Sequence, residues 1–395
     1  MCWPYDTVLT IAFEVFRLLF FTLDSCHGID MLNDAPTSGR IRSVQTPVIP
    51  FVQDLVTANP GTIPLGQGVV HFPPPTEAIQ QLREFGGDPD HHLYGPIEGI
   101  EPLQVAIRQK LQRENALDLD GSAIVVTAGS NMAFLQALLT VADPGDEIIL
   151  FLPYYFNQEM AVLTAGCRPV TVPVDQFYLP DPGLVESAIS LRTRAIVTIS
   201  PNNPTGNLLT ERDARALLKT GVIVCVDETY YEFSGSTLCP LLDEYENLVI
   251  LRSFSKWAGI AGLRVGYAIA SSELIGHLMD IKQPYNINIA GEAAVLAALE
   301  HRGELLERAA TLIEQRKRLE AVVDEFPGIS YYPSEANFLL CRFERRTAEE
   351  AYVELAQRGI FVRRFPQTVL DSSLRISTGT PEQTDLLIDA LRRVV

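Results

Sequence analysis

The chain alternates short, continuous apolar runs with longer stretches of helical periodicity, and this alternation constrains its fold more than any other feature. In the apolar runs hydrophobic residues follow one another without polar ones between, which is typical of strands covered on both faces. Helical patterns separate several of the runs, for example at 131–141 and at 210–219, where Thr210 is a plausible N-cap. This order predicts an α/β domain with a mostly parallel sheet. The runs expected to form strands are 123–127, 147–151, 194–200, 222–228, 248–253 and 264–270.

After Pro284 the pattern changes to that of a smaller α+β domain. A long helical stretch from about 291 to 326, with a break expected near Gly303, is followed by shorter strands. The segment before Pro73 is expected to join this smaller domain. The predicted strands are 329–332, 337–342, 360–363 and 374–377. The predicted parts are an N-terminal extension at 1–30, a segment at 31–72 that joins the small domain, a large domain at 73–285 and a small C-terminal domain at 286–395.

The N-terminal extension is apolar from residue 7 to residue 23, but Glu14 and Arg17 interrupt it. A membrane-spanning helix needs about 20 mostly apolar residues, so these charges argue against one. A basic start and a small-residue cleavage site, which mark a signal peptide, are also missing. We favour a non-essential extension from an upstream start codon, with Met31 as the true start. An ordinary packed helix and a membrane-surface segment are the alternatives.

Charge and cysteine content limit the partners of the chain. It has 395 residues, with 31 Lys and Arg against 49 Asp and Glu, a formal net charge of −18. So acidic a protein repels phosphate backbones, and we expect no nucleic-acid partner; local arginines must hold any anionic substrate. The six cysteines form no CxxC pair and no cluster at zinc spacing, which predicts no metal site and fits a reducing compartment.

The segment SFSKWAGIAGLRVGY at 253–267 carries the strongest chemical signal. Lys256 lies just past a predicted buried strand, among small residues and hydroxyls. A desolvated amine loses proton affinity and becomes a nucleophile that can form a Schiff base. Ser253 and Arg264, together with the hydroxyl of Ser255, can hold a phosphate. A solvated turn lysine is the alternative for Lys256 taken alone.

Four further segments place polar residues at the ends of predicted strands. In VDETYYEF, Asp227 can accept a hydrogen bond from a protonated pyridine nitrogen, and Tyr230 can donate to a phenolic oxygen. Asn203, in the stiff turn SPNNPTGN, can bind cofactor and substrate oxygens. In TAGSNMAF, free N–H groups at a helix start suit a phosphate. Arg375, in SLRISTGT, needs an anionic partner, either a substrate carboxylate or an internal acid.

Taken together, AGSNMAF, PNNPTG, DETYYEF, SFSK…GLRVGY and LRISTGT resemble the class I/II aminotransferases of the fold-type I pyridoxal-phosphate enzymes, from about Val44 to Val395. The resemblance implies a large domain with a mostly parallel seven-stranded sheet and a smaller α+β domain. It implies pyridoxal 5′-phosphate as cofactor and a ping-pong transfer of an amino group to a 2-oxo acid. Lys256 would form the aldimine with the cofactor and then shuttle the substrate proton.

The same resemblance implies a role for each residue that matches the family's motifs. For the ring, Asp227 would bind the pyridine nitrogen, Tyr230 and Asn203 the 3′ oxygen, and Tyr155 would stack on the ring. For the substrate, Arg375, Gly68 and Asn203 would bind the α-carboxylate. The implied phosphate ligands are Ser130, Asn131, Ser253 and Arg264, with Tyr94 reaching the phosphate of the neighbouring subunit in a homodimer.

The two halves of the chain resemble different subfamilies. LGQGVVHFPPP, YGPIEG and FLPYYFN resemble plant-type aromatic and methionine aminotransferases, and we favour an aromatic or methionine-like donor, with Phe72 and Tyr155 lining an apolar pocket. KQPYNIN, YYPSEANFLL and GIFVRR resemble histidinol-phosphate aminotransferases, in which Arg363 would help to bind the substrate phosphate. A NENPYGPS-like run typical of that subfamily is absent. No arginine lies between Val265 and His301, which disfavours a dedicated aspartate site.

A carbon–sulfur β-lyase on the same fold is a further alternative, since it uses the same lysine and needs no acceptor. A non-catalytic sensor is disfavoured because Lys256 and Asp227 are both present. We expect a cytoplasmic enzyme of amino-acid metabolism and biosynthesis, with amino acids and 2-oxo acids as substrates and no membrane partner.

Overall fold

The computed structural model describes residues 38–44, 56–57, 60–68, 70–87, 89–119, 121–365 and 368–394. The predicted extension at 1–30 lies outside these residues. Two compact units are present, Met1–Val48 and Ile49–Val395. The described part of the first unit holds the short helix α2 (Arg40–Ser43), whose first N–H bonds the Ser38 hydroxyl at 3.3 Å. All other described helices and strands belong to the second unit.

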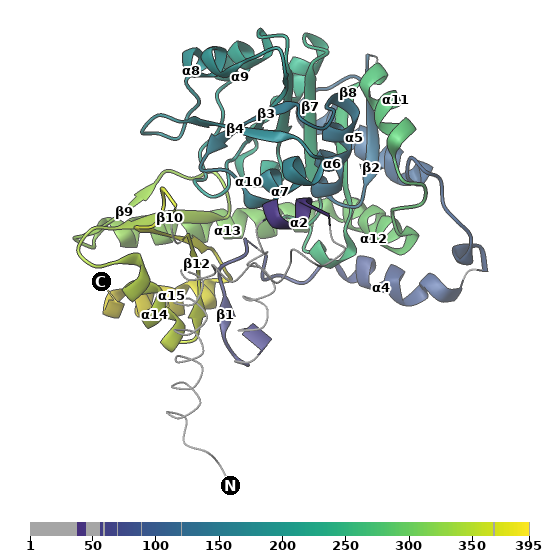
Figure 1. Ribbon diagram of the computed structural model, residues 1–395. Helices are drawn as coiled ribbons and strands as arrows, with labels where there is room; N and C mark the ends of the chain where they lie inside the picture. The colour runs from purple at the N-terminus through teal and green to yellow at the C-terminus, as the bar shows by residue number, and fades with distance from the viewer. Residues whose placement is uncertain are drawn as a thin grey trace. The chain divides into compact units, whose positions relative to one another are not determined.

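A sheet of seven strands, counted over the described residues, organises the larger part of the second unit (Figure 1). The strand β8 is antiparallel to both of its neighbours, and all other pairs are parallel. The predicted α/β fold with a mostly parallel sheet is therefore confirmed. In spatial order the strands are β2 (Ser122–Thr127), β8 (Gly266–Ser271), β7 (Leu248–Ser253), β6 (Ile223–Asp227), β5 (Thr193–Ile199), β3 (Glu147–Leu152) and β4 (Arg168–Pro173).

The continuous apolar runs arise because successive side chains of a strand point into two different cores. In β3, Ile149 belongs to one core and Leu150 to the other. The first core includes residues from α5 (Glu101–Asn115), α9 (Glu211–Leu218) and α12 (Ile289–Glu300). The second is covered by α6 (Ser130–Val141), α7 (Phe156–Thr164) and α11 (Ser272–Ile281).

The strand β4 was missing from the sequence-based list of strands. Its residues RPVTVP contain two prolines and are mostly half-buried or exposed, because β4 is the edge of the sheet. The other six strands agree with the predicted runs to within two residues at each end. Thr210 caps α9 as expected, since its side chain accepts the N–H of Asp213.

A second, antiparallel sheet of four strands within the described residues lies at the lower left of Figure 1. In spatial order its strands are β12 (Arg363–Arg364), β13 (Ser373–Ser377), β10 (Phe338–Phe343) and β9 (Ile329–Tyr332). The helices α13 (Arg302–Asp324) and α14 (Ala348–Gln357) contact it, and α15 (Pro381–Val394) packs on both of them.

One predicted strand of this part differs from the structure, and one predicted helix break agrees with it. The predicted strand at 360–363 is divided: β11 (Ile360–Phe361) pairs in parallel with β1 (Ile63–Pro64), and only β12 joins the four-stranded sheet. The break expected near Gly303 is confirmed, since α12 ends and α13 begins at His301, two residues before Gly303. Because β1 pairs with β11, the segment before Pro73 is bonded to the C-terminal part of the chain. The exact domain boundaries stay a prediction.

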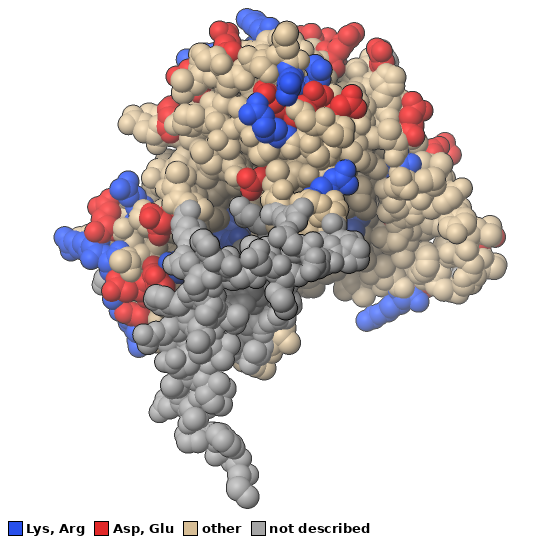
Figure 2. All heavy atoms as spheres, viewed as in Figure 1, with Lys and Arg blue, Asp and Glu red and all other residues tan. Residues whose placement is uncertain are grey.

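The remaining helices are short. The described residues contain no helix long and apolar enough to cross a membrane. Acidic and basic side chains are interspersed over the upper part of the face in Figure 2.

The remaining helical segments are α4 (Thr76–Glu84), η3 (Phe85–Gly87), η4 (Pro89–His92), α8 (Pro182–Ala188), α10 (Tyr231–Ser234), η5 (Cys239–Asp243) and η6 (Ala261–Leu263).

Candidate active site

The carboxyl ends of three neighbouring parallel strands bring the predicted polar residues to one edge of the large sheet. Asp227 is the last residue of β6 and Ser253 the last of β7, and Asn203 lies in the loop that follows β5. Ligands of parallel α/β sheets bind at this edge, since loops rather than helices begin there.

Lys256 lies in the turn after β7, and its amine is not paired with a carboxylate in the described structure. The Nζ atom donates to the backbone carbonyl of Gln67 at 3.1 Å. Burial lowers the pKa of Lys256 to about 8, and the charges of Arg375 and Arg264 lower it further than the carboxylate of Asp227 raises it. A much larger fraction of this amine is therefore uncharged near neutral pH than of an ordinary lysine, and the uncharged form is the one that acts as a nucleophile or proton acceptor.

Asp227 is a buried carboxylate that lacks a full countercharge. One of its oxygens accepts the backbone N–H of Thr229 at 2.9 Å, and the Thr229 hydroxyl lies 3.1 Å from that of Ser130. Desolvation raises the pKa of Asp227 despite the hydrogen bonds from Thr229. A cationic ligand group at this carboxylate would offset the cost of burying its charge.

The start of α6 and the turn after β7 form a cradle for an anion. No side chain caps the first N–H groups of α6, and Gly129 before it has φ +83°. A Cβ at Gly129 would lie 2.4 Å from a guanidinium nitrogen of Arg264, so any other residue would be strained by the positive φ and would displace that guanidinium. Arg264 itself donates to the Ser255 hydroxyl at 3.2 Å. Exposed helix N–H groups beside a guanidinium suit a phosphate.

Arg375, on β13, is buried and forms no ion pair with a carboxylate among the described residues. Its guanidinium donates to the side-chain oxygen of Asn203 and, at 2.6 Å, to the carbonyl of Gly66, while its Nε has no hydrogen-bond partner among the described residues. Burial lowers its pKa. Of the two partners considered from sequence, an internal acid is not what the described structure provides, and an anionic ligand remains.

A second arginine lies directly beside the first. Arg363 of β12 is the register partner of Arg375, so the two side chains project from the same face of the sheet. Burial and the charge of Arg375 lower the pKa of Arg363 to about 10. Its guanidinium lies 5.9 Å from the ring of Phe156 and 5.7 Å from that of Phe365. Two adjacent cations without a described carboxylate partner form a site for an anion of more than one charge.

Gly68 and Tyr230 meet between these two groups of residues. A Cβ at Gly68, which has φ +63°, would lie 3.3 Å from the Tyr230 hydroxyl. The Gly68 N–H donates to Ser377 at 2.9 Å, and its carbonyl accepts from Asn337 at 3.1 Å. The chain from Gly66 to Gly68 therefore lines the space next to Lys256 and Arg375.

Tyr155 and Asn131 lie at the rim of the site. Tyr155 is half-buried; burial raises its pKa, and so does the charge of Asp227, whereas a hydrogen bond from Asn131 and the arginines lower it. Asn131 is exposed. Tyr94 does not join the others: it is 81% exposed and stacks on Tyr285 at 4.3 Å.

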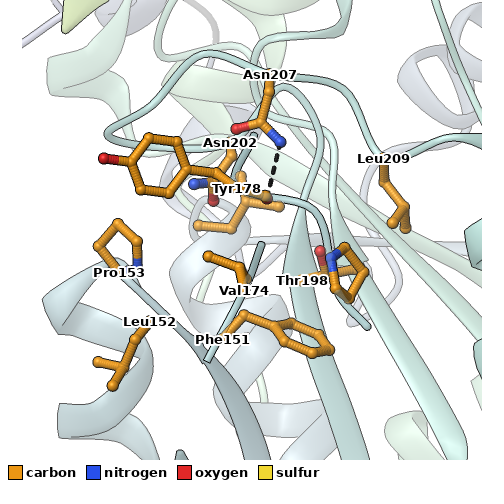
Figure 3. A pocket seen from close by; sticks show the side chains of 11 residues that line it. Phe151, Leu152, Pro153, Val174, Tyr178, Thr198, Asn202, Asn207 and Leu209 are labelled. Atoms are coloured by element: carbon orange, nitrogen blue, oxygen red, sulfur yellow. Dashed lines mark hydrogen bonds between the residues drawn. The ribbon is translucent and has the colours of Figure 1, made fainter. Parts of the chain in front are cut away.

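Two features lie apart from this cluster. Phe72, predicted to line an apolar pocket with Tyr155, instead lines a narrow space with Trp257 and Leu312 that does not include Tyr155. A hollow at the carboxyl ends of β3 and β5 is shown in Figure 3, where the Asn207 amide bonds the carbonyl of Tyr178 at 3.1 Å. None of the predicted site residues lines that hollow.

The sequence of this chain matches the family model of class I and II aminotransferases over residues 60–391. The chain belongs to the class I and II aminotransferases. Its lysine, aspartate and arginines thus lie in the fold and the sequence context of that family. The predicted family, fold and enzyme class are confirmed, and the cofactor is pyridoxal 5′-phosphate.

Known proteins similar to this aminotransferase carry several activities in their names. A histidinol-phosphate aminotransferase from Roseiflexus castenholzii is 40% identical over 275 residues, which cover 69% of this chain and 74% of the relative. The structure of N-succinyldiaminopimelate aminotransferase from Mycobacterium tuberculosis is 25% identical, with a TM-score of 0.80, and covers 91% of this chain and 100% of its own. An Escherichia coli protein with a methionine aminotransferase function shares the fold, with a TM-score of 0.79 and 22% identity over 90% of this chain and 99% of its own.

The aminotransferase has donor groups that fit each part of the cofactor. A phosphate fits the uncapped start of α6, where a Cβ at Gly129 or Gly266 would collide with neighbouring atoms. A ring nitrogen that carries a proton fits Asp227, and the weakly basic amine of Lys256 fits an aldehyde.

Three residues beside the site were not singled out from the sequence. Thr229 links Asp227 to Ser130, Asn337 holds Gly68, and the carbonyl of Gln67 holds Lys256. Thr229 lies inside the motif DETYYEF, between Asp227 and Tyr230, so it could have been predicted from the sequence as a polar residue of the site. Asn337 and Gln67 act across 269 and 189 residues of sequence, for which a single sequence carries no signal.

Proposed function

We propose that the predicted site residues act in this aminotransferase as follows. Lys256 attaches the cofactor and takes and returns the proton at the substrate Cα, since burial lowers the pKa of its amine to about 8 and brings its titration close to neutral pH. Asp227 binds the ring nitrogen, Asn203 and Tyr230 bind the ring oxygen, and Tyr155 covers the ring. Bound pyridoxal phosphate supplies the electron sink that makes the Cα proton removable. Ser130, Asn131, Ser253 and Arg264 bind its phosphate, and Gly68, Asn203 and Arg375 bind the substrate anion.

We propose histidinol phosphate as the amino donor and a 2-oxo acid as the acceptor. The observation that carries this proposal is the adjacent pair of the half-buried Arg363 and the buried Arg375, two cations with no described carboxylate partner. A phosphate monoester carries a charge between −1.5 and −2 at pH 7, so two guanidinium groups match it. The curated relative from R. castenholzii carries the name of this activity.

An aromatic or methionine-like donor, which the N-terminal half of the sequence favoured, is the second candidate. The aromatic rings of Tyr155 and Phe156, 5.0 Å apart at the rim of the site, support it because they offer an apolar surface to a large neutral side chain. In that case Arg375 alone would bind the substrate carboxylate, and Arg363 would have no negatively charged group of the substrate to bind.

A half-reaction screen tests the two candidates. Holoenzyme is mixed with histidinol phosphate, methionine, phenylalanine and glutamate in turn, and loss of the visible cofactor band is followed. We expect histidinol phosphate to have the highest kcat/KM, and Arg363→Met to lower that value by about 100-fold, since truncating one side of a buried charge pair costs 2–5 kcal/mol. Arg364→Met is the matched control, because the neighbouring Arg364 pairs with Glu349 at 3.1 Å.

A higher kcat/KM for methionine or phenylalanine, with no effect of Arg363→Met, would instead favour the second candidate. Release of pyruvate and ammonia from a cysteine conjugate without an acceptor would favour the β-lyase. We also propose that the enzyme is a cytoplasmic homodimer. The exposed, stacked pair Tyr94 and Tyr285 supports a dimer, because large apolar rings at the surface gain from burial.

A further inference from the structure

A fully buried set of charged and aromatic side chains lies beneath the site and takes no part in the chemistry proposed above. We call it the buried ion network: Lys110, Glu228, Tyr231, Glu232 and Arg252. Lys110, Glu228 and Arg252 are each 1% exposed. Buried charges are rare and costly, so a closed network of them requires either a stabilising or a positioning explanation.

Arg252 and Glu228 form the centre of the network. The Arg252 Nε donates to a carboxylate oxygen of Glu228 at 2.9 Å, and one terminal nitrogen of Arg252 lies 2.7 Å from the same oxygen in an ion pair. The other oxygen of Glu228 accepts the backbone N–H of Leu238 at 2.7 Å. The guanidinium also lies 3.6 Å from the centre of the Tyr231 ring. These contacts fix Arg252 from several directions.

Lys110 extends the network towards the first core. Its Nζ pairs with Glu232 and with Glu114, each at 2.9 Å. It also lies 4.9 Å from the centre of the Tyr231 ring and 5.2 Å from that of Trp257. Burial opposes its charge, but the nearby carboxylates, Glu232 above all, outweigh burial and raise its pKa. Lys110 is therefore a fixed cation rather than a titrating base.

Four site residues on β6, β7 and the turns directly after them are chain neighbours of a residue in or against this network. Glu228 follows Asp227, Tyr231 follows Tyr230, Arg252 precedes Ser253, and Trp257 follows Lys256. Along β7, Arg252 and Ser253 point to opposite faces of the sheet, so that one faces the network and the other the site. The network thus holds the chain neighbours of Asp227, Tyr230, Ser253 and Lys256 in place.

We propose that the buried ion network is a positioning device for the cofactor site: it sets the relative placement of Asp227, Tyr230, Ser253 and Lys256. The proposal rests on the proposed roles of those four residues. The Arg252–Glu228 pair fixes the ends of β6 and β7 relative to each other, and Lys110 fixes the turns that carry Tyr230 and Lys256 to α5. A binding site made of four separate loops and strand ends needs such support, because small displacements of its groups weaken binding.

Equilibrium binding of pyridoxal 5′-phosphate to the cofactor-free protein tests the proposal. Three quantities are compared between wild type and Glu228→Gln: the Kd, from quenching of tryptophan fluorescence; the circular dichroism of the bound cofactor's visible band; and the melting temperature of the cofactor-free protein. We expect the Kd to rise at least about 10-fold, as for the removal of supporting partners at other preorganised sites, and the visible dichroism to change. Arg252→Lys should recover part of the affinity that Arg252→Met loses.

Glu147→Gln is the matched control. Glu147 is also a buried carboxylate, bonded to Ser190 and Arg168. It is the first residue of β3, so it lies at the amino ends of the parallel strands, away from the site at their carboxyl ends. We expect it to lower the melting temperature without changing the Kd or the dichroism. If Glu228→Gln behaves in the same way, the network is only stabilising and the proposal is wrong.

If Glu228→Gln does not fold, a milder substitution in the network provides the test. Tyr231→Phe removes only the hydroxyl that accepts from Asn115 at 2.6 Å, and we expect it to raise the Kd about threefold, the size of one lost hydrogen bond. An unchanged Kd and unchanged dichroism in Tyr231→Phe would then overturn the proposal. Borohydride reduction should still attach the cofactor to Lys256 in every network variant. Failure of that attachment in the wild type would contradict the proposed role of Lys256 instead.

Discussion

Two groups of buried cations lie close together in this aminotransferase and differ in one respect. In the buried ion network, Lys110 and Arg252 are each paired with carboxylates, and neighbouring charges raise the pKa of both. In the site, Lys256 and Arg375 have no described carboxylate partner, and burial lowers the pKa of both.

The difference shows that burial alone does not mark a functional cation. The chemistry depends on whether the protein itself supplies the countercharge. Where it does, the cation is held in one place and one protonation state. Where it does not, the cation either gives up its proton, as Lys256 does in part, or needs an anion from outside, as Arg375 and Arg363 do.

The largest effect that follows from this comparison concerns Lys256. Lys256→Ala should abolish borohydride-reducible attachment of pyridoxal phosphate and lower kcat/KM at least about 1,000-fold, because it removes both the nucleophile and the proton carrier. Lys282 is the control, since burial also lowers its pKa to about 8, but it lies at the end of α11 and its amine bonds the carbonyl of Ile97, which is not a site residue. Lys282→Met should keep most of the activity; equal losses in the two variants would mean that Lys256 has no special role.

Stability should separate the two groups next. Arg252→Met should lower the free energy of unfolding of the cofactor-free protein by about 3–5 kcal/mol, because it leaves Glu228 buried without its partner. Arg375→Met should lower it by no more than about 1 kcal/mol, since only hydrogen bonds to Asn203 and Gly66 are lost and an uncompensated buried charge is removed. Urea unfolding measures both values. Equal values would show that the two arginines do not differ in pairing.

The smallest effect is a pH dependence. The uncharged amine attacks the aldehyde, so the rate of cofactor attachment to the cofactor-free protein should rise with pH up to about 8 and then level off. An ordinary lysine, with a pKa of 10.5, would keep accelerating above pH 9. In Arg375→Met the plateau should move to higher pH, because a neighbouring positive charge has been removed. Stopped-flow absorbance measures the profile, and a rate that still rises tenfold per pH unit above pH 9 would contradict the lowered pKa.

Much of the fold followed from local pattern. Six strands of the large sheet were predicted because strands buried on both faces need uninterrupted apolar runs, and Ile149 and Leu150 show the two cores that such runs serve. The edge strand β4 was missed because a strand with one free edge tolerates prolines and polar residues. The strand predicted at 360–363 was divided because its two halves find partners in two different sheets, which no local pattern encodes.

The candidate site could also be predicted only in part: its local motifs could be read from the sequence, but its contacts between distant segments could not. Asp227, Tyr230, Ser253 and Lys256 could be proposed as site residues because each belongs to a short motif next to a strand end, and the structure brings them to one edge of the sheet. The pairing of Arg363 with Arg375 was not, because it is set by the register of two strands. The contacts of Lys256 with Gln67 and of Asn337 with Gly68 also join distant segments, and nothing near any of these residues in sequence predicts its partner.

The sequence by itself determined the order of strands and helices, the two-sided burial of the large sheet and the chemical groups at its strand ends. These depend on residue type and on spacing over a few positions. Only the tertiary structure decided which buried cations are paired. A countercharge acts through space, and Arg252 and Glu228 are 24 residues apart, whereas Lys256 and Arg375 meet no carboxylate partner in the described structure.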